Sequence, residues 1–364
     1  MTNVMSPLMR ARAFCDYFEI RAPILMAPMA GACPASLAIA VANGGGLGGC
    51  GALLMQPQAM FAWAAEVRAQ TNGAFQFNLW IPDPPPVRDI DHEGKVRAFL
   101  EQWGPAVTPE VADVAPIDFT AQCEAMLDIG PATISSIMGV YPPAFVARMK
   151  IKGIRWLATV TTVAEARAAV AAGADCVVAQ GMEAGGHRGS FEADRSDTAL
   201  IGLFALLPAV VDAVGDRVPV IATGGIADGR TIAAALLLGA SAVQIGTGLL
   251  RTPEARLAPA LAAAIGAAQP EDTVPTRAFS GRLARSIATA YVKAAHAPTA
   301  PTPAPYPVQR ALTQAIRDAA IKSGDIDRMQ AWAGQSARLA SSEPAAGLVR
   351  RLWNDTQALL AASG

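Results

Sequence analysis

Short apolar runs alternate with longer helical patterns over most of the chain, and this alternation constrains the fold more than any other feature. Eight runs predict strands, which begin near Pro23, Gly45, Phe75, Pro131, Ile154, Asp175, Val218 and Ala242. Helical patterns such as residues 163–172 and 228–238 lie between them, and Gly173 and Gly239 end two of these patterns. Repeated helix–glycine–strand units are typical of the crossovers that build a parallel sheet. The sequence therefore predicts an α/β protein.

The number of these units favours a barrel. Eight units within about 250 residues match the size of a (β/α)8 TIM barrel. An open, doubly wound sheet is the alternative fold, because hydrophobic periodicity does not distinguish the two. Residues 82–114 break the rhythm after the third strand and begin with a run of prolines, so we predict an insertion there. We assign residues 1–270, with this insertion, to the barrel.

Residues 271–364 are predicted to form a helical C-terminal extension that packs on the barrel. The proline-rich residues 297–307 are interpreted as a stiff connector within it. Three helical patterns follow this connector, at residues 308–322, 326–339 and 345–360.

The composition excludes several functional classes. The 364 residues carry a formal net charge of −1, and 16% of them are charged whereas 52% are hydrophobic. Without a basic excess the chain is not expected to bind nucleic acid, and its apolar content is not that of a disordered chain. Residues 231–250 carry no charge and have the length of a membrane span, but glycines and polar residues interrupt them. We interpret them as a buried helix followed by a buried strand, and we expect no membrane association.

The cysteines indicate a reducing compartment. There are five of them, an odd number, and no two form a C-x-x-C pair. Neither a disulfide framework nor a zinc site is therefore expected. Residues 1–20 contain no apolar stretch typical of a signal peptide. We expect a cytoplasmic protein.

Glycines follow the last two predicted strands. Gly224 and Gly225 come after the seventh, and Gly246 and Thr247 come after the eighth. In (β/α)8 barrels the loops after these two strands often bind a phosphate group, because glycines let the backbone approach it and helix N-termini offer free N–H groups. The alternative is that these glycines only make tight turns. Two glycine sites at successive late strands favour the phosphate site.

His187 is the candidate catalytic base. It is one of three histidines, and it lies among glycines directly after the sixth predicted strand. The C-terminal ends of barrel strands are where such enzymes carry their chemistry, and a histidine on an uncrowded loop suits a general base. A structural histidine is the alternative. No second histidine or cysteine lies at ligand spacing, so no metal site is expected.

Residues 46–51 satisfy the pattern G-x-G-x-x-G of dinucleotide-binding loops. That motif requires a strand before it and a helix that opens within it. Here a helical pattern precedes it, and the next helix is predicted only from about Gln56. We interpret residues 46–51 as a glycine-rich second strand with its turns.

The motifs together resemble the nitronate monooxygenase family, formerly called 2-nitropropane dioxygenases, and in particular its bacterial class I members. The similarity extends from about Pro23 to Leu360. The segments that carry it are residues 27–31, 42–48, 77–79, 179–181, 183–189, 224–226, 244–247, 281–285 and 306–309. The block at residues 183–189 is the most specific of them, whereas the Gly-Gly-Ile block is shared by many phosphate-binding barrels.

This resemblance implies an FMN-dependent barrel and assigns a role to each matching residue. The isoalloxazine ring would lie against Pro28, Met29 and Ala30. The polar atoms of the flavin would be bound by Asn78 and Gln180. The phosphate would be held by Gly185, Gly224, Gly225, Gln244, Gly246 and Thr247. His187 would be the base that faces the flavin.

The resemblance also implies a reaction. An alkyl nitronate, or a nitroalkane first deprotonated by His187, would give an electron to FMN, and molecular oxygen would reoxidise the flavin. The products would be a carbonyl compound and nitrite. Many members have Ser-Phe-His near the end of strand four and Thr-His after strand five, where this chain has Ser-Ile-Met at residues 136–138 and Thr-Thr at residues 161–162. His187 is therefore the histidine left to act as a base.

Other functions stay open at this point. One is an FMN-dependent reductase on the same scaffold, which would use NAD(P)H to reduce a quinone or an enoyl thioester. Another is a phosphate-ligand binding barrel or a sugar-phosphate lyase without flavin. A Schiff-base lyase needs a lysine at a strand end, and Lys152 precedes a strand instead. The sequence also leaves the oligomeric state open, a homodimer included.

Overall fold

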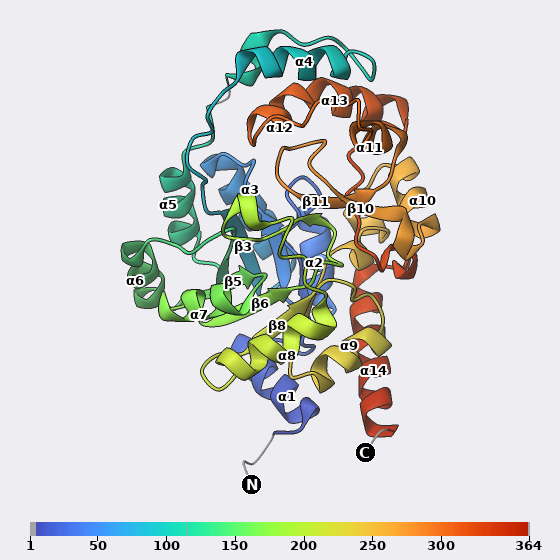
Figure 1. Ribbon diagram of the computed structural model, residues 1–364. Helices are drawn as coiled ribbons and strands as arrows, with labels where there is room; N and C mark the ends of the chain where they lie inside the picture. Colours follow the sequence, from blue (N-terminus) through green and yellow to red (C-terminus); the bar gives the residue numbers. More distant parts are fainter. Residues whose placement is uncertain (1–4, 114, 363–364) are drawn as a thin grey trace.

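The centre of the molecule is a closed barrel of eight parallel strands (Figure 1). The computed structural model describes residues 5–113 and 115–362. The barrel strands are β1 (Ile24–Met26), β2 (Gly48–Gly51), β3 (Phe75–Trp80), β4 (Thr133–Ile137), β5 (Arg155–Val160), β6 (Cys176–Gln180), β8 (Val220–Thr223) and β9 (Ala242–Ile245). They follow the order β1-β9-β8-β6-β5-β4-β3-β2. The predicted (β/α)8 barrel is confirmed, and all eight strands lie where the apolar runs predicted them.

Backbone hydrogen bonds at Leu47 close the ring between β1 and β2. The amide of Met26 donates to the Leu47 carbonyl over 2.8 Å, and the amide of Leu47 donates to the Ile24 carbonyl over 3.0 Å. This closure excludes the open, doubly wound sheet. Residues 1–4, 114 and 363–364, at the ends of the predicted barrel, insertion and extension, lie outside the described residues.

Helices alternate with the strands along the chain, as expected of crossovers in a parallel barrel, and surround the barrel. They are α2 (Ala35–Asn43), α3 (Pro57–Gln70), α5 (Phe119–Ile129), α6 (Pro143–Ile151), α7 (Val163–Ala171), α8 (Leu203–Val214) and α9 (Gly229–Leu237). Asp228 caps α9, accepting from the amide of Thr231 over 2.9 Å. The uncharged residues 231–250 therefore divide into part of α9 and the strand β9, as predicted. Within the described part of the chain, no helix is long and apolar enough to cross a membrane.

The barrel interior is apolar at one end and polar at the other. A cluster that includes Leu25, Leu157 and Ile221 fills the N-terminal half, and the helix α1 (Pro7–Phe18) closes that end with Phe14 and Phe18. The side chains of β3 alternate by strand periodicity, so its aromatic residues at positions 75 and 77 pack outward. Its polar residues at positions 76 and 78 therefore face the C-terminal half of the interior.

The insertion and the C-terminal residues pack on each other above the barrel (Figure 1). The insertion contains α4 (Ile90–Leu100) and the short helix η1 (Pro109–Ala112). After β9 come η3 (Thr247–Leu249), η4 (Pro253–Ala255), α10 (Pro259–Ala267) and η5 (Pro270–Asp272). The C-terminal part that follows contains α11 (Ala290–Ala295), α12 (Val308–Leu312) and α13 (Gln314–Ser323). One apolar cluster joins the two parts, with Val96 and Leu100 from the insertion and Phe279, Tyr291 and Leu312 from the C-terminal part.

A second, three-stranded sheet also belongs to this region. Its strands are β10 (Thr273–Thr276), β11 (Ala284–Ile287) and β7 (Gly186–His187), in the order β10-β11-β7. The chain beyond residue 270 thus contributes two strands as well as helices. After β7 a short helix, η2 (Ala193–Arg195), leads towards α8.

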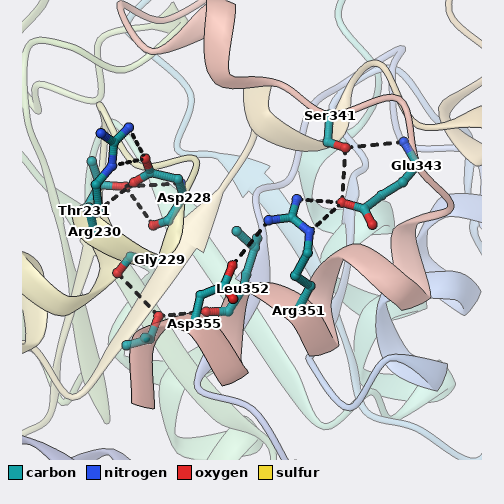
Figure 2. A network of polar contacts seen from close by, with 10 residues as sticks. Asp228, Gly229, Arg230, Thr231, Ser341, Glu343, Arg351, Leu352 and Asp355 are labelled. Atoms are coloured by element: carbon teal, nitrogen blue, oxygen red, sulfur yellow. Dashed lines mark hydrogen bonds and ion pairs between the residues drawn. The ribbon is translucent and has the colours of Figure 1, made fainter. Parts of the chain in front are cut away.

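The last helix, α14 (Ala345–Ala362), packs on α9 and α2 and completes the ring of helices around the barrel. Figure 2 shows its contact with the start of α9. A Cβ atom on Gly229 would lie 2.7 Å from the Cβ of Asp355, and Arg351 donates to Asp355 over 3.2 Å and to Glu343 over 2.9 Å. The division of the chain at residue 270 stays a prediction, and the structure adds that α14 lies in the barrel's own helical ring.

Two of the three C-terminal helical patterns need correction. Residues 308–322 form two helices, which meet at Thr313, where the hydroxyl donates to the Phe279 carbonyl over 2.6 Å. The helix predicted at residues 326–339 is wrong, since only η6 (Ala337–Leu339) forms there. Gly324 ends α13 in the left-handed conformation, with φ +69°. The backbone that follows makes isolated turns, such as the bond from the Met329 amide to the Ile326 carbonyl over 3.2 Å, and also bonds to other loops.

Candidate active site

The two predicted glycine loops lie at the C-terminal ends of the seventh and eighth barrel strands. Gly224 and Gly225 follow β8, and their φ angles of +107° and +70° are ones that glycine adopts without strain. Gly246 follows β9, and η3 begins at the next residue, Thr247. A barrel phosphate site usually includes such a short helix. The structure thus places these four residues at the C-terminal end of the barrel, and their contact with a phosphate stays a prediction.

Close backbone packing brings these loops against the neighbouring ones. A Cβ on Gly224 would lie 3.1 Å from the amide nitrogen of Ala184, in the loop after β6. A Cβ on Gly246 would lie 3.4 Å from the Sδ of Met29, in the loop after β1. The loops after β6, β8, β9 and β1 therefore form one continuous rim at the C-terminal end of the barrel.

His187 lies over this rim, in the short strand β7. It pairs with Ala284 of β11, so the C-terminal part of the chain fixes its backbone. Its Nε2 lies 2.8 Å from the Oγ of Ser280. The centroid of its ring is 4.6 Å from that of Trp80 and 5.3 Å from that of Trp332, in edge-on contacts. Among the described residues, the ring of His187 thus has one hydrogen-bond partner, Ser280, and two aromatic neighbours.

The surroundings keep His187 neutral. Burial, together with the positive charges of Arg282 and Arg310, lowers the pKa of His187 to about 3. Arg282 is 2% exposed; it forms an ion pair with Asp83 of the insertion and donates to the Ser190 carbonyl over 3.0 Å. A neutral imidazole with two guanidinium groups nearby can accept a proton, and the local field favours an anionic ligand.

Gln180 holds the loop that carries His187. Its Nε2 donates to the His187 carbonyl over 3.0 Å, and its Oε1 accepts from the amide of Gly189 over 2.8 Å. The buried Arg188 supports the same loop with a hydrogen bond to the Ala199 carbonyl over 2.9 Å. The structure therefore gives Gln180 a contact with the loop of the base, and its predicted contact with a flavin stays a prediction.

Asn78 and Gln244 point into the polar half of the barrel. Asn78 donates to the Oγ of Ser135 over 3.0 Å. Gln244 on β9 accepts from the Nε2 of Gln76 on β3 over 3.4 Å, across the barrel. The Oε1 of Gln76 is buried and has no hydrogen-bond partner among the described residues. The Oε1 of Gln76 is thus free to accept a hydrogen bond from a donor that is not part of the described chain.

The loop after β1 holds Pro28, Met29 and Ala30, all partly buried at the rim. The amide of Met29 donates to the Sγ of Cys33 over 2.7 Å. A Cβ on Gly51 would lie 2.5 Å from the amide nitrogen of Ala30, so this glycine lets the loop lie directly against the end of β2.

Several residues of the site were not found from the sequence. Ser280, Trp332 and Gly334 carried no motif, and the last two fall in the segment wrongly predicted as a helix. Arg282 lies in a segment that resembles the family but had no role assigned to it. Trp80 could have been found, because strand alternation places it on the same side as residues 76 and 78. Among the described residues, no group of three or more His, Cys, Asp or Glu side chains is arranged to hold a metal ion.

Comparison with known proteins gives a consistent result over nearly the whole chain. The profile of the nitronate monooxygenase family matches residues 12–355. A probable nitronate monooxygenase of Staphylococcus aureus (strain MSSA476) is 35% identical over 345 residues, which are 94% of this chain and 96% of that protein.

Solved structures show the same likeness. Nitroalkane oxidase from Streptomyces ansochromogenes is similar with a TM-score of 0.87 and 36% identity, over 97% of this chain and 100% of that one. FabK from Thermotoga maritima is similar with a TM-score of 0.74 and 28% identity, over 96% of this chain and 97% of that one.

Proposed function

The chain belongs to the nitronate monooxygenase family, a family of flavin-dependent oxidoreductases. From this premise we propose that it binds FMN and oxidises alkyl nitronates with molecular oxygen to a carbonyl compound and nitrite. The placement of His187 at the C-terminal end of the barrel, with its ring bonded to Ser280 and in contact with Trp80 and Trp332, is the observation that carries this proposal. The similarity to nitroalkane oxidase supports a substrate that contains a nitro group.

The residues at the rim fit FMN. The glycine loops after β8 and β9 give backbone access for a phosphate, and the unpartnered Oε1 of Gln76 leaves a buried acceptor beneath the rim for a polar group. In this proposal the isoalloxazine ring lies against Pro28, Met29 and Ala30, and its polar atoms bond to Asn78 and Gln180. The phosphate is held by Gly185, Gly224, Gly225, Gln244, Gly246 and Thr247.

Bound FMN would supply the electron transfer from the nitronate and onward to oxygen. The protein's own residues bind and orient the substrate. Arg282 and Arg310 attract the nitronate anion towards the pocket, and the Trp80 and Trp332 rings exclude water around His187. For a neutral nitroalkane, His187 would first remove the proton from the carbon next to the nitro group. Since its pKa is about 3, His187 is a weak base, and we expect preformed nitronates to be the better substrates.

The partners and location complete the proposal. The partners are a nitronate or nitroalkane and molecular oxygen, with no nucleic acid or membrane. All five cysteines are buried and free, a state that a reducing compartment preserves, so we propose a cytoplasmic enzyme. A homodimer is proposed as its assembly, and sedimentation of the purified chain tests it.

One experiment separates the candidate functions. We expect the purified chain to show flavin absorbance and, with propionate 3-nitronate, to consume oxygen and release nitrite. Rapid bleaching of the flavin by NADH without oxygen would instead favour an NAD(P)H reductase. A chain that neither contains nor takes up FMN would favour a phosphate-ligand barrel.

A further inference from the structure

Residues 331–335, which we call the strap, cross the rim between two loops of the candidate cofactor site. At its start, the Ala331 carbonyl accepts from the amide of Ile287 over 2.9 Å. Further on, the amide of Gly334 donates to the Oγ1 of Thr247 over 3.0 Å, and the amide of Gln335 donates to the Glu183 carbonyl over 2.9 Å. The strap is thus bonded to the loop after β9 and to the loop after β6.

Gly185 and Gly334 pack backbone against backbone. A Cβ on Gly185 would lie 2.5 Å from the amide nitrogen of Gly334, and a Cβ on Gly334 would lie 2.9 Å from the amide nitrogen of Gly185. It would also lie 2.7 Å from the Glu183 carbonyl oxygen. Real Cβ atoms do not approach backbone atoms this closely. Any side chain at residue 334 therefore displaces the strap from this loop.

The hydrogen bond to the strap orients the Thr247 hydroxyl. Because its oxygen accepts from the amide of Gly334, its proton is left to donate elsewhere. No acceptor for that proton occurs among the described residues. Thr247 directly follows Gly246 in the loop after β9, so the hydroxyl stands in one of the two glycine loops of the candidate phosphate site.

We propose that the strap is a positioning element for the cofactor phosphate, and that Gly334 fixes the Thr247 hydroxyl so that it donates to a phosphate oxygen. This inference rests on the proposed binding of FMN. The strap also carries Trp332, whose ring contacts His187. One short segment therefore links the phosphate loops to the pocket of the candidate base, although its residues are remote from both in the sequence.

The test compares two ligands that differ only in the phosphate. Riboflavin has the ring and ribityl chain of FMN without the phosphate, so a phosphate-positioning residue affects the affinity for FMN alone. Gly334→Ala is tested in the full-length chain after removal of bound flavin, and affinities are read from the quenching of flavin fluorescence. Gly347→Ala is the matched control, because a Cβ on Gly347 meets no atom within 4 Å.

We expect Gly334→Ala to weaken FMN binding about tenfold, the effect of one lost hydrogen bond to a charged group, and to leave riboflavin binding unchanged. Gly347→Ala should change neither. Thr247→Val should cause the same loss as Gly334→Ala, and the double variant should lose no more than either. An FMN-to-riboflavin affinity ratio in Gly334→Ala equal to that of the wild type would overturn the inference.

A second pair of variants applies if Gly334→Ala does not fold. Thr247→Ser keeps the hydroxyl and should keep the affinity ratio, whereas Thr247→Val should lower it about tenfold; equal ratios in the two variants would overturn the inference. Flavin binding by the wild-type chain tests the proposed function separately from this inference. A wild-type chain that binds no flavin, or binds FMN no better than riboflavin, has no phosphate site for the strap to position.

Discussion

The Nε2 of His187 and the Oγ of Ser280 lie 2.8 Å apart, and this hydrogen bond determines which ring nitrogen can act as a base. The Ser280 hydroxyl donates to the Arg282 carbonyl over 3.2 Å. Its oxygen is therefore left to accept from Nε2–H, which places the lone pair of the neutral imidazole on Nδ1. The proton-accepting atom is thus on the side of the ring away from Ser280.

Replacement of His187 by asparagine should separate the two substrate classes. We expect His187→Asn to retain FMN and to lose about 100-fold in turnover of neutral nitroalkanes, the lower range for loss of a general base. Turnover of preformed nitronates should fall less than tenfold, since no proton has to be removed from them. Nitrite release and oxygen uptake measure both. Equal losses on the two substrates would contradict a role in proton abstraction.

Removal of the Ser280 hydroxyl should affect the same step. In Ser280→Ala, the Nε2 of His187 loses its partner, and the imidazole is free to rotate or to change tautomer. We expect kcat/KM for nitroalkanes to fall by about tenfold, the cost of one hydrogen bond, while nitronate turnover and FMN content stay near those of the wild type. Ser280→Thr keeps the hydroxyl and should restore most of the rate. If Ser280→Thr is as slow as Ser280→Ala, the hydroxyl is not the cause.

The ion pair between Asp83 and Arg282 should stabilise the fold. The Arg282 side chain is only 3% exposed, whereas Asp83 is 28% exposed, so Asp83→Asn leaves a buried guanidinium without a counter-charge. We expect the free energy of unfolding in urea to fall by about 2–3 kcal/mol. The control is Asp197→Asn. The Asp197 side chain is 54% exposed, and that of its partner Arg277 is 28% exposed. A solvated pair of this kind should change stability by less than about 1 kcal/mol, and equal losses in the two variants would contradict the prediction.

The pKa of His187 predicts how stability depends on pH. Folding lowers this pKa from 6.5 to about 3, so between these values the unfolded chain binds more protons than the folded one. The contribution of His187 is therefore fully present above about pH 6.5 and is lost as the pH falls towards 3. Between pH 7 and pH 4.5 we expect the urea midpoint of the flavin-free wild type to fall further than that of His187→Asn. Parallel curves would show that His187 has an ordinary pKa in the folded chain.

The barrel could be predicted from the sequence because its elements repeat locally. Most strands are short apolar runs, and some crossovers end in a recognisable turn glycine, as at Gly173 and Gly239. The glycine loops after β8 and β9 could also be predicted, since counting the strands places them at the end of the barrel where phosphate sites occur. His187 was found from its glycine-rich setting at a strand end.

The pocket around His187 could not be predicted in the same way. Ser280 and Trp332 reach it from 93 and 145 residues further along the chain, through the pairing of β7 with β11 and the course of the strap. Gly334 looks like a weak helix position in the sequence, and only its contact with Gly185 shows why it has to be a glycine. Long-range contacts between irregular segments leave no periodic signal, so they need the structure.

The junction of α9 and α14 gives a further test of how the barrel is closed (Figure 2). Gly229 begins α9, and a Cβ added to it would lie 2.7 Å from the Cβ of Asp355 and 3.2 Å from the amide nitrogen of Thr356. We expect Gly229→Ala to lower the free energy of unfolding by about 2 kcal/mol, as overpacking does. Gly94→Ala, where the nearest atom is 4.0 Å from the new Cβ, should be neutral or slightly stabilising.

A compensating substitution shows whether this contact is the cause. Asp355→Gly removes the atom that the new methyl group would meet, at a cost of about 1 kcal/mol for a glycine inside a helix. In the Asp355→Gly background, Gly229→Ala should then lower the free energy of unfolding by less than half as much as it does in the wild type. Residues 229 and 355 are in direct contact, so the effects of the two substitutions do not add. If the cost is the same in both backgrounds, α14 does not limit the space at the start of α9, and its place as the last helix of the barrel ring does not depend on this glycine.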